Sequence, residues 1–456
     1  MLFSSIDFLY YFLPVVVGIY FFLPQKTRNG WLLLASLFFY GWGEPKYLLL
    51  MLGSITGSYL LGLAMGTGKH RRVWLTAAVV LNLGLLAVFK YADFAVENLN
   101  ALGLSLPLPR LALPIGISFY TFQTLSYLID VYRGWAEPQR NFIDFGCYVA
   151  LFPQLIAGPI VRYTDIASQL KSRQTTLDDF RLGLQRFLMG LGKKILIANQ
   201  LGAFVEFFRA SGEKSVLFYW LYALAFSLHI YFDFSGYSDM AIGLGRIFGF
   251  RFPENFNYPY LSASVQEFWR RWHMSLGSWF RDYLYIPLGG SRVGKAKWLR
   301  NVLAVWLLTG LWHGAAWNFV AWGLMFALLL LLEKQFSFPK KLPTCLRHGY
   351  VLLAVGLSFV IFNANGMGQA FSDLAGMFGF GGIPLVSAET LYYLRSYLVT
   401  FGIAVIGCLP LAKDYVNRMN PKFLAFAQPI VMAALLLLCT AYLVDGSFNP
   451  FLYFRF

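Results

Sequence analysis

The sequence carries little charge. Only 13% of its 456 residues are Asp, Glu, Lys or Arg, whereas 58% are hydrophobic and 19% are aromatic. A soluble domain would carry about 25% charged residues. The composition therefore excludes an ordinary soluble protein and predicts a polytopic membrane protein.

Cysteine is also scarce, and the four cysteines (Cys147, Cys345, Cys408 and Cys439) are scattered without paired spacing. This distribution argues against a disulfide framework and against a metal centre. The net charge of +15 does not indicate nucleic-acid binding, because the basic residues stand in short clusters between apolar runs. Such clusters are the positive-inside pattern of membrane proteins.

The N-terminal region has no Lys or Arg before its apolar run and no small-residue cleavage site. It is therefore predicted to be a retained first span over Phe8–Leu23, not a removed signal peptide. Basic clusters at 26–28 and 69–72 flank two further apolar runs, Trp31–Trp42 and Tyr47–Met65. Placing both clusters in the cytoplasm predicts a hairpin between them and an extracytoplasmic N-terminus.

The apolar runs together predict roughly ten to twelve membrane passes, some short or re-entrant, in one integral-membrane domain over 1–456. Beyond the runs already named, spans are predicted at Val73–Lys90, Ile195–Phe208, Val216–Phe232, Tyr350–Phe362, Leu391–Leu409 and Ile430–Val444.

Some segments depart from this plain pattern. Leu111–Tyr132 contains proline, glycine and polar residues, so it is predicted to be kinked and to face protein or a cavity, not lipid. Leu177–Lys194 is amphipathic and is predicted to lie in the plane of the cytoplasmic surface. Asp233, Asp239 and Arg246 stand so close to spans that they are expected to pair or to face a cavity.

His313 lies within a long uncharged run, Asn301–Leu332. As one helix these residues would measure about 48 Å, against roughly 30 Å of bilayer core. The run is therefore predicted to break or to form two spans, and small residues around His313 (Gly310, Gly314, Ala315 and Ala316) mark the expected break. An ionisable side chain at a helix break within the membrane is costly, so His313 is interpreted as functional.

His273 is the other histidine of the same region. On a helix it would share one apolar face, at the i, i+3, i+4, i+7 spacing, with Trp269, Trp272, Leu276 and Phe280. The pattern predicts an amphipathic helix that buries His273 and presents arginines, with Glu267 four residues before Arg271 as an ion pair. A structural histidine, hydrogen-bonded to backbone, and a functional one both fit this position.

The segment from Glu267 to Arg300 is basic, with Arg270 and Arg271 at its start. It is either a positive-inside loop beside anionic lipid or a funnel for a phosphorylated donor, and charge alone does not separate the two.

The sequence lacks a metal cluster, a nucleotide-binding loop and a paired-carboxylate signature. Group transfer by general base catalysis then fits best, because a neutral imidazole can take a hydroxyl proton as that oxygen attacks a carbonyl. Asn318 could donate to the oxyanion. It stands five residues from His313, however, so the two converge only if the helix breaks.

At these residues the chain resembles the membrane-bound O-acyltransferases, in particular the bacterial branch typified by the membrane subunit of alginate O-acetyltransferase. The matching blocks are spread over nearly the whole chain and follow a shared order. They are FSSIDFLYYFLPVVVGIYFFLP, LPIGISFYTFQTLSYLIDVYRG, FDFSGYSDMAIGLGRIFGFRFPENFNYPYL, EFWRRWHMSLGSWFRDYLYIPLGG, GLWHGAAWNFVAWG and the terminal FLYFRF.

The resemblance implies an all-α polytopic membrane protein, with about ten to twelve transmembrane or re-entrant helices in a ring around a thinned central tunnel. The family's catalytic histidine, in its Trp-His-Gly block, carries over to His313, and its second functional histidine to His273. His313 would be the general base or a transient acyl acceptor. The candidate substrate-binding residues are Arg270, Arg271, Glu267, Asn318 and Asp239.

The resemblance also implies acetyl transfer in the bacterial cytoplasmic (inner) membrane. Acetyl-CoA would be the cytoplasmic donor substrate, with no bound cofactor and no metal, and hydroxyls of an exported, alginate-like polysaccharide the acceptor. The acetyl group would pass through an extracytoplasmic transferase or acyl-carrier partner. Two alternatives are D-alanyl transfer from a carrier-protein thioester to teichoic acid, and a non-catalytic polysaccharide-export or transport component.

Overall fold

The structure, a computed structural model, describes residues 1–446 and 451. The described residues form helices and no strands, which confirms the all-α prediction. The chain forms two compact units, Met1–Phe187 with Tyr237–Glu254 and Leu188–Gly236 with Asn255–Phe456. The terminal FLYFRF block lies outside the described residues, apart from Phe451.

The helices up to the first change of unit are α1 (Leu13–Phe22), α2 (Arg28–Gly43), α3 (Leu48–Gly66), α4 (Arg71–Leu86), α5 (Ala92–Ala101), α6 (Ile117–Arg133), α7 (Phe142–Ala150), α8 (Phe152–Leu155), α9 (Tyr163–Lys171) and α10 (Leu177–Gly192). The later helices are α11 (Asn199–Ala210), α12 (Val216–Ile247), α13 (Val265–Arg271), α14 (Met274–Phe280), α15 (Lys295–His313), α16 (Trp317–Phe336), α17 (Phe338–Lys341), α18 (Thr344–Phe362), α19 (Met367–Met377), α20 (Ala388–Gly407), α21 (Leu411–Asn417) and α22 (Pro421–Asp445). Helices α10 and α12 contribute residues to both units.

Among the described residues, seven helices are long and apolar enough to cross a bilayer. All seven overlap runs that the sequence marks as apolar. The first predicted span forms a shorter apolar helix, Asp7–Phe22. The larger number of passes, which counts short and re-entrant segments, stays a prediction. The seven are Pro45–Gly66, Arg71–Ala101, Val216–Ile247, Trp317–Phe336, Thr344–Phe362, Ala388–Gly407 and Pro421–Asp445.

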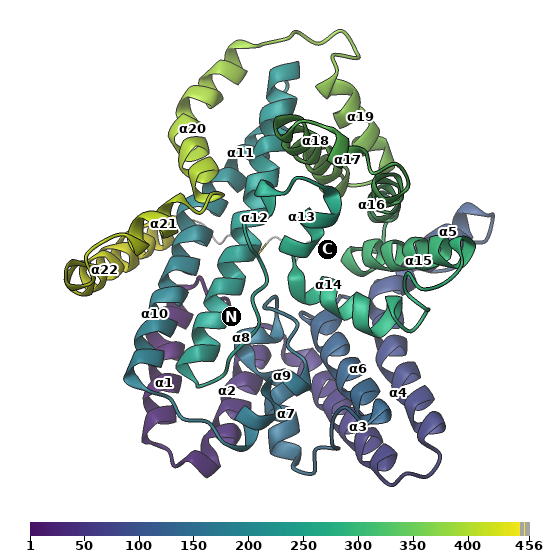
Figure 1. Ribbon diagram of the computed structural model, residues 1–456, viewed down its shortest axis with the longest axis vertical. Coiled ribbons are helices and arrows are strands. Elements are labelled where there is room, and N and C mark those ends of the chain that lie inside the picture. The colour runs from purple at the N-terminus through teal and green to yellow at the C-terminus, as the bar shows by residue number, and fades with distance from the viewer. Residues whose placement is uncertain (447–450, 452–456) are drawn as a thin grey trace. The chain divides into compact units, whose positions relative to one another are not determined.

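Two helices run further than the sequence predicts. The span predicted at Val73–Lys90 continues through a π-helical turn and ends at Ala101. Helix α12 passes through the polar stretch after Phe232 and ends only at Ile247 (Figure 1). The helix continues through these polar residues because their charges pair with side chains of other elements. No isolated charge is therefore buried along this part of α12.

Those partners confirm the prediction that the charged residues of α12 pair. In the second unit, Lys194 Nζ lies 2.5 Å from Asp233 Oδ1, and both side chains are almost fully buried, with 2% and 1% exposed. The backbone of α12 also comes close to that of the π-helical turn Lys193–Ala198 here. A Cβ on Gly236 would lie 3.2 Å from the backbone N of Lys194. In the first unit, Arg186 lies 2.8 Å from Asp239 and 2.5 Å from Glu254.

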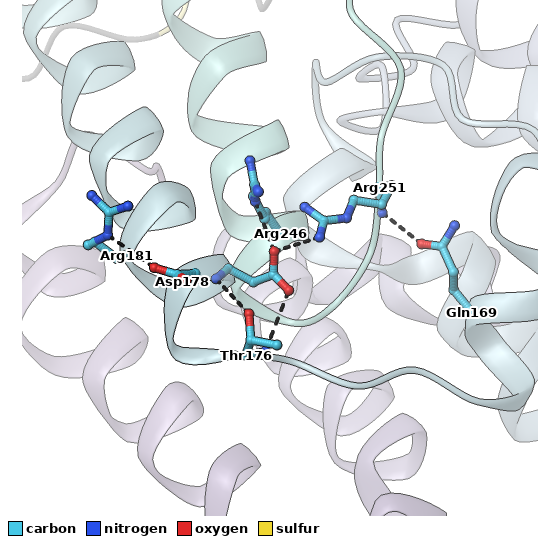
Figure 2. Close-up of polar contacts among 7 residues, drawn as sticks. Gln169, Thr176, Asp178, Arg181, Arg246 and Arg251 are labelled. Atoms are coloured by element: carbon cyan, nitrogen blue, oxygen red, sulfur yellow. Dashed lines mark hydrogen bonds and ion pairs between the residues drawn. The ribbon is translucent and has the colours of Figure 1, made fainter. Parts of the chain in front are cut away.

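The last charged residue of α12, Arg246, belongs to a half-exposed group in the first unit. Asp179, in the first turn of α10, accepts from Arg246 Nε at 3.3 Å and from Arg251 Nη2 at 2.5 Å. Figure 2 shows Arg246 and Arg251 reaching toward the start of α10, where Thr176 lies. Burial raises the pKa of Asp179, but the hydrogen bonds from Arg251 and Thr176 outweigh it and hold that pKa at about 2.

The amphipathic segment predicted at Leu177–Lys194 is a helix, and it runs through a π-helical turn directly into α11. Its place in the membrane plane stays a prediction. The polar segment Leu111–Tyr132 faces protein as predicted, because nearly every residue of α6 is buried. It is not a kinked helix, however: α6 starts only at Ile117, so its proline and glycine precede the helix. Glycine at 116 has a φ of 77°, which suits that turn.

Candidate active site

The uncharged run around His313 breaks where the small residues predict it. Helix α15 ends at His313, three residues follow, and α16 starts at Trp317. Glycines let the two helices touch: a Cβ on Gly310 would lie 2.3 Å from the backbone O of Phe319. A Cβ on Gly314 would lie 2.1 Å from the ring of Phe319, so no other residue fits there without displacing that ring. The break therefore fixes His313 at the end of α15.

His313 is surrounded by aromatic rings and is 5% exposed. Its ring centroid lies 5.0 Å from that of Trp312, 5.0 Å from that of Trp322 and 5.3 Å from that of Phe362. These rings meet it nearly edge-on, at interplanar angles of 78–80°. The imidazole therefore lies in surroundings of low polarity, where electrostatic interactions with a bound reactant are stronger than in water.

His273 is buried as predicted, but the predicted helix around it is wrong. Helix α13 ends at Arg271 and α14 starts at Met274, so the apolar face does not lie on one continuous helix. His273 itself adopts the left-handed region, with φ 44° and ψ 53°. That conformation costs roughly 1–2 kcal/mol for a residue other than glycine. A backbone held in this state points to a functional use of the side chain.

The helix breaks because Asn255 takes hydrogen bonds that a continuous helix would make internally. Its backbone O accepts from Met274 N at 2.9 Å, and its side-chain Oδ1 accepts from Ser275 N at 3.3 Å. The i, i+3, i+4 spacing of the apolar residues carries no information about this partner, which stands 18 residues away from His273. The spacing therefore predicts the buried residues but not the break.

Asn255 also fixes the tautomer of His273. The atoms His273 Nδ1 and Asn255 Oδ1 lie 3.1 Å apart, and the hydroxyl of Ser275 donates to the same Oδ1 at 2.8 Å. The backbone N–H of Ser275 can only donate, so this atom is the amide oxygen and Nδ1 must donate to it. The proton of the neutral ring is thus on Nδ1, and Nε2 carries the lone pair.

Nε2 of His273 is buried and has no hydrogen-bond partner among the described residues. His273 lies outside the seven candidate spans, and burial lowers its pKa to about 3. The ring is therefore neutral at physiological pH. It can accept a hydrogen bond from a hydroxyl, although it is a weaker base than a histidine with an ordinary pKa.

The structure brings the two histidines together around one indole. The ring centroid of Trp312 lies 5.9 Å from that of His273 and 5.0 Å from that of His313. We call His273, Trp312, His313, Trp322 and Phe362 the histidine cluster. Residues from α15, α16, α18 and the α13–α14 break thus meet in one buried group.

The other predicted site residues have different surroundings. Glu267 and Arg271 form the predicted ion pair, at 2.9 Å, and Arg270 is exposed. The side-chain N–H groups of Asn318 face the carbonyls that end α18, at Ile361, Phe362 and Ala364. Those donors already have acceptors in the protein. The role of Asn318 toward the oxyanion stays a prediction. Asp239 lies in the first unit with Arg186.

Asn255, Trp312 and Trp322 are the residues that the sequence reasoning did not single out. All three stand within quoted blocks, but no spacing rule separates them from the neighbouring aromatic and polar residues. Their importance comes from contacts between helices that are distant in the sequence.

The sequence is similar to known proteins of one family. The sequence model of the membrane-bound O-acyltransferase family matches residues 138–371, which include both histidines. The chain is 41% identical to the probable alginate O-acetylase of Azotobacter vinelandii, over all of both chains. It is 37% identical to the peptidoglycan O-acetyltransferase of Helicobacter pylori, over 98% of this chain and 90% of that protein.

A third relative, the teichoic acid D-alanyltransferase of Bacillus subtilis, is 30% identical over 54% of this chain and 67% of its own. The apolar helices and these matches describe a multi-pass membrane protein. The chain belongs to the membrane-bound O-acyltransferase family and is an O-acyltransferase.

Proposed function

We propose that this protein transfers an acetyl group from cytoplasmic acetyl-CoA across the inner membrane toward hydroxyls of an exported polysaccharide. The single observation that carries the proposal is the histidine cluster: His313 and His273 lie buried around Trp312. The full-length match to a relative named as an alginate O-acetylase supports the acetyl group and the polysaccharide.

In the proposed reaction His313 is the general base. It takes the hydroxyl proton while the hydroxyl oxygen forms a bond to the carbonyl carbon of the thioester. The tetrahedral intermediate then collapses, the carbon–sulfur bond breaks, and His313 returns the proton to the sulfur. The products are an O-acetyl ester and the free thiol. His273 assists, because the lone pair of its Nε2 can accept a hydrogen bond from the hydroxyl and orient it.

Acetyl-CoA, the donor, would bind at the basic segment that begins at Arg270. The guanidinium of Arg270 is exposed and would attract the phosphates of acetyl-CoA, whereas Arg271 is already paired with Glu267. An extracytoplasmic transferase or acyl carrier would receive the acetyl group on the side where the N-terminus lies. The surrounding bilayer holds the basic loops at its cytoplasmic face.

The relatives suggest a second acceptor. The peptidoglycan O-acetyltransferase matches over nearly the whole chain, so the glycan strands of peptidoglycan are the alternative polysaccharide. D-alanyl transfer rests on a match to 54% of the chain only. Analysis of acetyl esters on each exported polymer in cells with and without the protein distinguishes the two acceptors.

The test uses inverted membrane vesicles that carry the protein, its extracytoplasmic transferase or acyl carrier and the polysaccharide, with labelled acetyl-CoA outside. We expect label to accumulate in the enclosed polysaccharide. His313→Ala should lower this rate by roughly 10²–10⁴-fold, the usual contribution of a general base. The matched control is His348→Ala, which removes a half-exposed histidine whose Nδ1 lies 3.1 Å from the backbone O of Ser262.

The control should transfer acetyl groups at the wild-type rate, and both variants should insert at wild-type levels. Wild-type transfer by His313→Ala would remove His313 from the reaction. If the wild-type protein accepted only a carrier-protein D-alanyl thioester and left labelled acetyl-CoA unused, the D-alanyl alternative would replace the proposal.

A further inference from the structure

Trp322 carries a hydrogen-bond donor that the protein itself does not use. Its side chain is 1% exposed, and its indole Nε1 has no acceptor among the described residues. An indole N–H can only donate, so no other role is open to this atom. Leaving such a buried donor unsatisfied destabilises the fold, because the N–H loses its bond to water and gains none in the protein. Phenylalanine would fill much of the same space without that cost.

The indole ring of Trp322 lies beside the imidazole of His313, the proposed base. The indole and imidazole centroids of Trp322 and His313 lie 5.0 Å apart, and the rings meet at 80°. Phe362 contacts both rings, at 5.2 Å and 5.3 Å, and closes the group. One small acyl group that reaches the imidazole is therefore also near the indole ring.

Two buried atoms in this region correspond to what the two reactants of an acyl transfer need. Trp322 offers a donor, and Nε2 of His273 offers an acceptor. A thioester carbonyl needs a donor for the negative charge that grows on its oxygen, and a hydroxyl needs an acceptor for its proton. Buried polar atoms that pair with nothing in the protein, beside a reactive group, are the expected appearance of such a site without substrate.

We propose that the Trp322 indole N–H binds the carbonyl oxygen of the acyl group and stabilises the oxyanion of the tetrahedral intermediate. The inference rests on the proposed function, since it requires acyl transfer at His313. As the hydroxyl oxygen bonds to the carbonyl carbon, the π electron pair moves onto the carbonyl oxygen, where the N–H donates to it. When the carbon–sulfur bond breaks, the pair returns and the donor is released.

Asn318 is the obvious rival for this role, one helical turn before Trp322 on α16. Its N–H groups already donate to the carbonyls at the end of α18, and the side-chain atom without a partner is its Oδ1, an acceptor. An acceptor would repel a growing negative charge. The oxyanion donor is therefore assigned to the indole.

The test replaces the N–H while it keeps an aromatic side chain. Trp322→Phe removes the donor, and 3-benzothienylalanine at position 322 keeps the indole shape with sulfur in place of the N–H. Both should lower kcat for acetyl transfer from acetyl-CoA by roughly 10²–10³-fold, as the loss of one oxyanion donor does. KM for acetyl-CoA should stay within about threefold, because the hydrogen bond to the neutral carbonyl is weak and strengthens mainly as negative charge grows on the oxygen in the transition state.

Trp269→Phe is the matched control. Its indole Nε1 is also buried without an acceptor among the described residues, and its ring packs 5.5 Å from that of Trp322. Its other ring contacts are with Phe268, Trp306 and Phe326, not with either histidine. We expect its kcat to stay within about threefold of wild type. The melting temperature of the benzothienyl variant should be unchanged or higher, since it loses an unsatisfied buried donor.

Two results would overturn the inference: a benzothienyl variant with wild-type kcat, or equal losses from Trp322→Phe and Trp269→Phe, which would make the effect one of packing. A wild-type protein that transfers no label from acetyl-CoA would instead overturn the proposed function, and the oxyanion assignment with it.

Discussion

The second unit contains two buried polar groups that differ in the partners that their side chains meet. Lys194 and Asp233 pair with each other at 2.5 Å, and neither side chain reaches solvent. In the histidine cluster, Nε2 of His273 and Nε1 of Trp322 are equally buried but meet no partner among the described residues. In the first group the two charges neutralise each other without any substrate. In the second, under the proposed function, the reactants would supply the missing hydrogen-bond partners.

The largest effect we predict concerns the ion pair. Asp233→Ala leaves the ammonium of Lys194 buried without its counter-charge, and breaking a buried pair in this way costs about 3–5 kcal/mol. We expect a matching fall in the free energy of unfolding, measured in detergent or in bilayer discs. The double variant Lys194→Met with Asp233→Leu should recover most of it, because apolar side chains then fill the space.

Acetyl transfer per folded molecule should survive in that double variant. A stable double variant that transfers no acetyl groups would place the ion pair in the catalytic machinery and would remove the distinction between the two groups.

A smaller effect should follow from changing the residue that holds His273. Asn255→Leu removes the acceptor of Nδ1–H, so the tautomer with its lone pair on Nε2 is no longer favoured. We expect kcat to fall by about 10- to 100-fold, less than the loss of a general base, because the ring itself remains. Ser275→Ala is the control: it removes a second donor to Asn255 Oδ1 but keeps the bond to His273.

The pH profile separates this role from a merely structural one. Burial lowers the pKa of His273 to about 3, and the residues that contact its ring, Phe234, Trp312 and Asn255, are uncharged. Asn255→Asp places a carboxylate beside Nδ1–H, which favours the protonated ring and raises its pKa. The acid limb of the kcat profile should therefore move to higher pH. An unchanged profile would show that His273 does not act through this bond.

The smallest effect should come from the half-exposed group in the first unit. Asp179→Asn weakens pairs with Arg246 and Arg251, whose side chains are 33% and 54% exposed, and exposed pairs are worth about 0–1 kcal/mol. We expect a melting temperature within a few degrees of wild type and unchanged acetyl transfer.

The pH dependence of this contribution has a definite sign. Because the pKa of Asp179 is held at about 2, its stabilisation is present above the unfolded pKa of about 3.9 and is lost as the pH falls toward 2. Thermal unfolding of wild type and Asp179→Asn should therefore converge at low pH. A difference that persisted there would mean that the carboxylate acts by something other than its charge.

The sequence predicts best what depends on local composition. The break after His313 follows from glycine and alanine in an overlong apolar run, and the pairing of Asp233, Asp239 and Arg246 follows from the cost of charge beside spans. The break at His273 could not be predicted, because its cause is Asn255, on a segment that the helical spacing does not include. The extension of α12 beyond Phe232 cannot be predicted for the same reason, because its charges are paired by residues of other elements.

The same limit applies to the candidate site. A histidine in an apolar run can be recognised in the sequence, and so can a block of residues that resembles a family. Whether the Trp322 N–H has an acceptor depends on its neighbours in three dimensions, which the sequence pattern does not give.

Phe319 closes the space beside Gly314, and Gly310 lies against the start of α16. The turn after His313 is therefore closely packed, because any side chain at position 314 would overlap the Phe319 ring. The backbone that carries the imidazole has little room to move. If His313 is the base, the acyl donor and the acceptor must both travel to it.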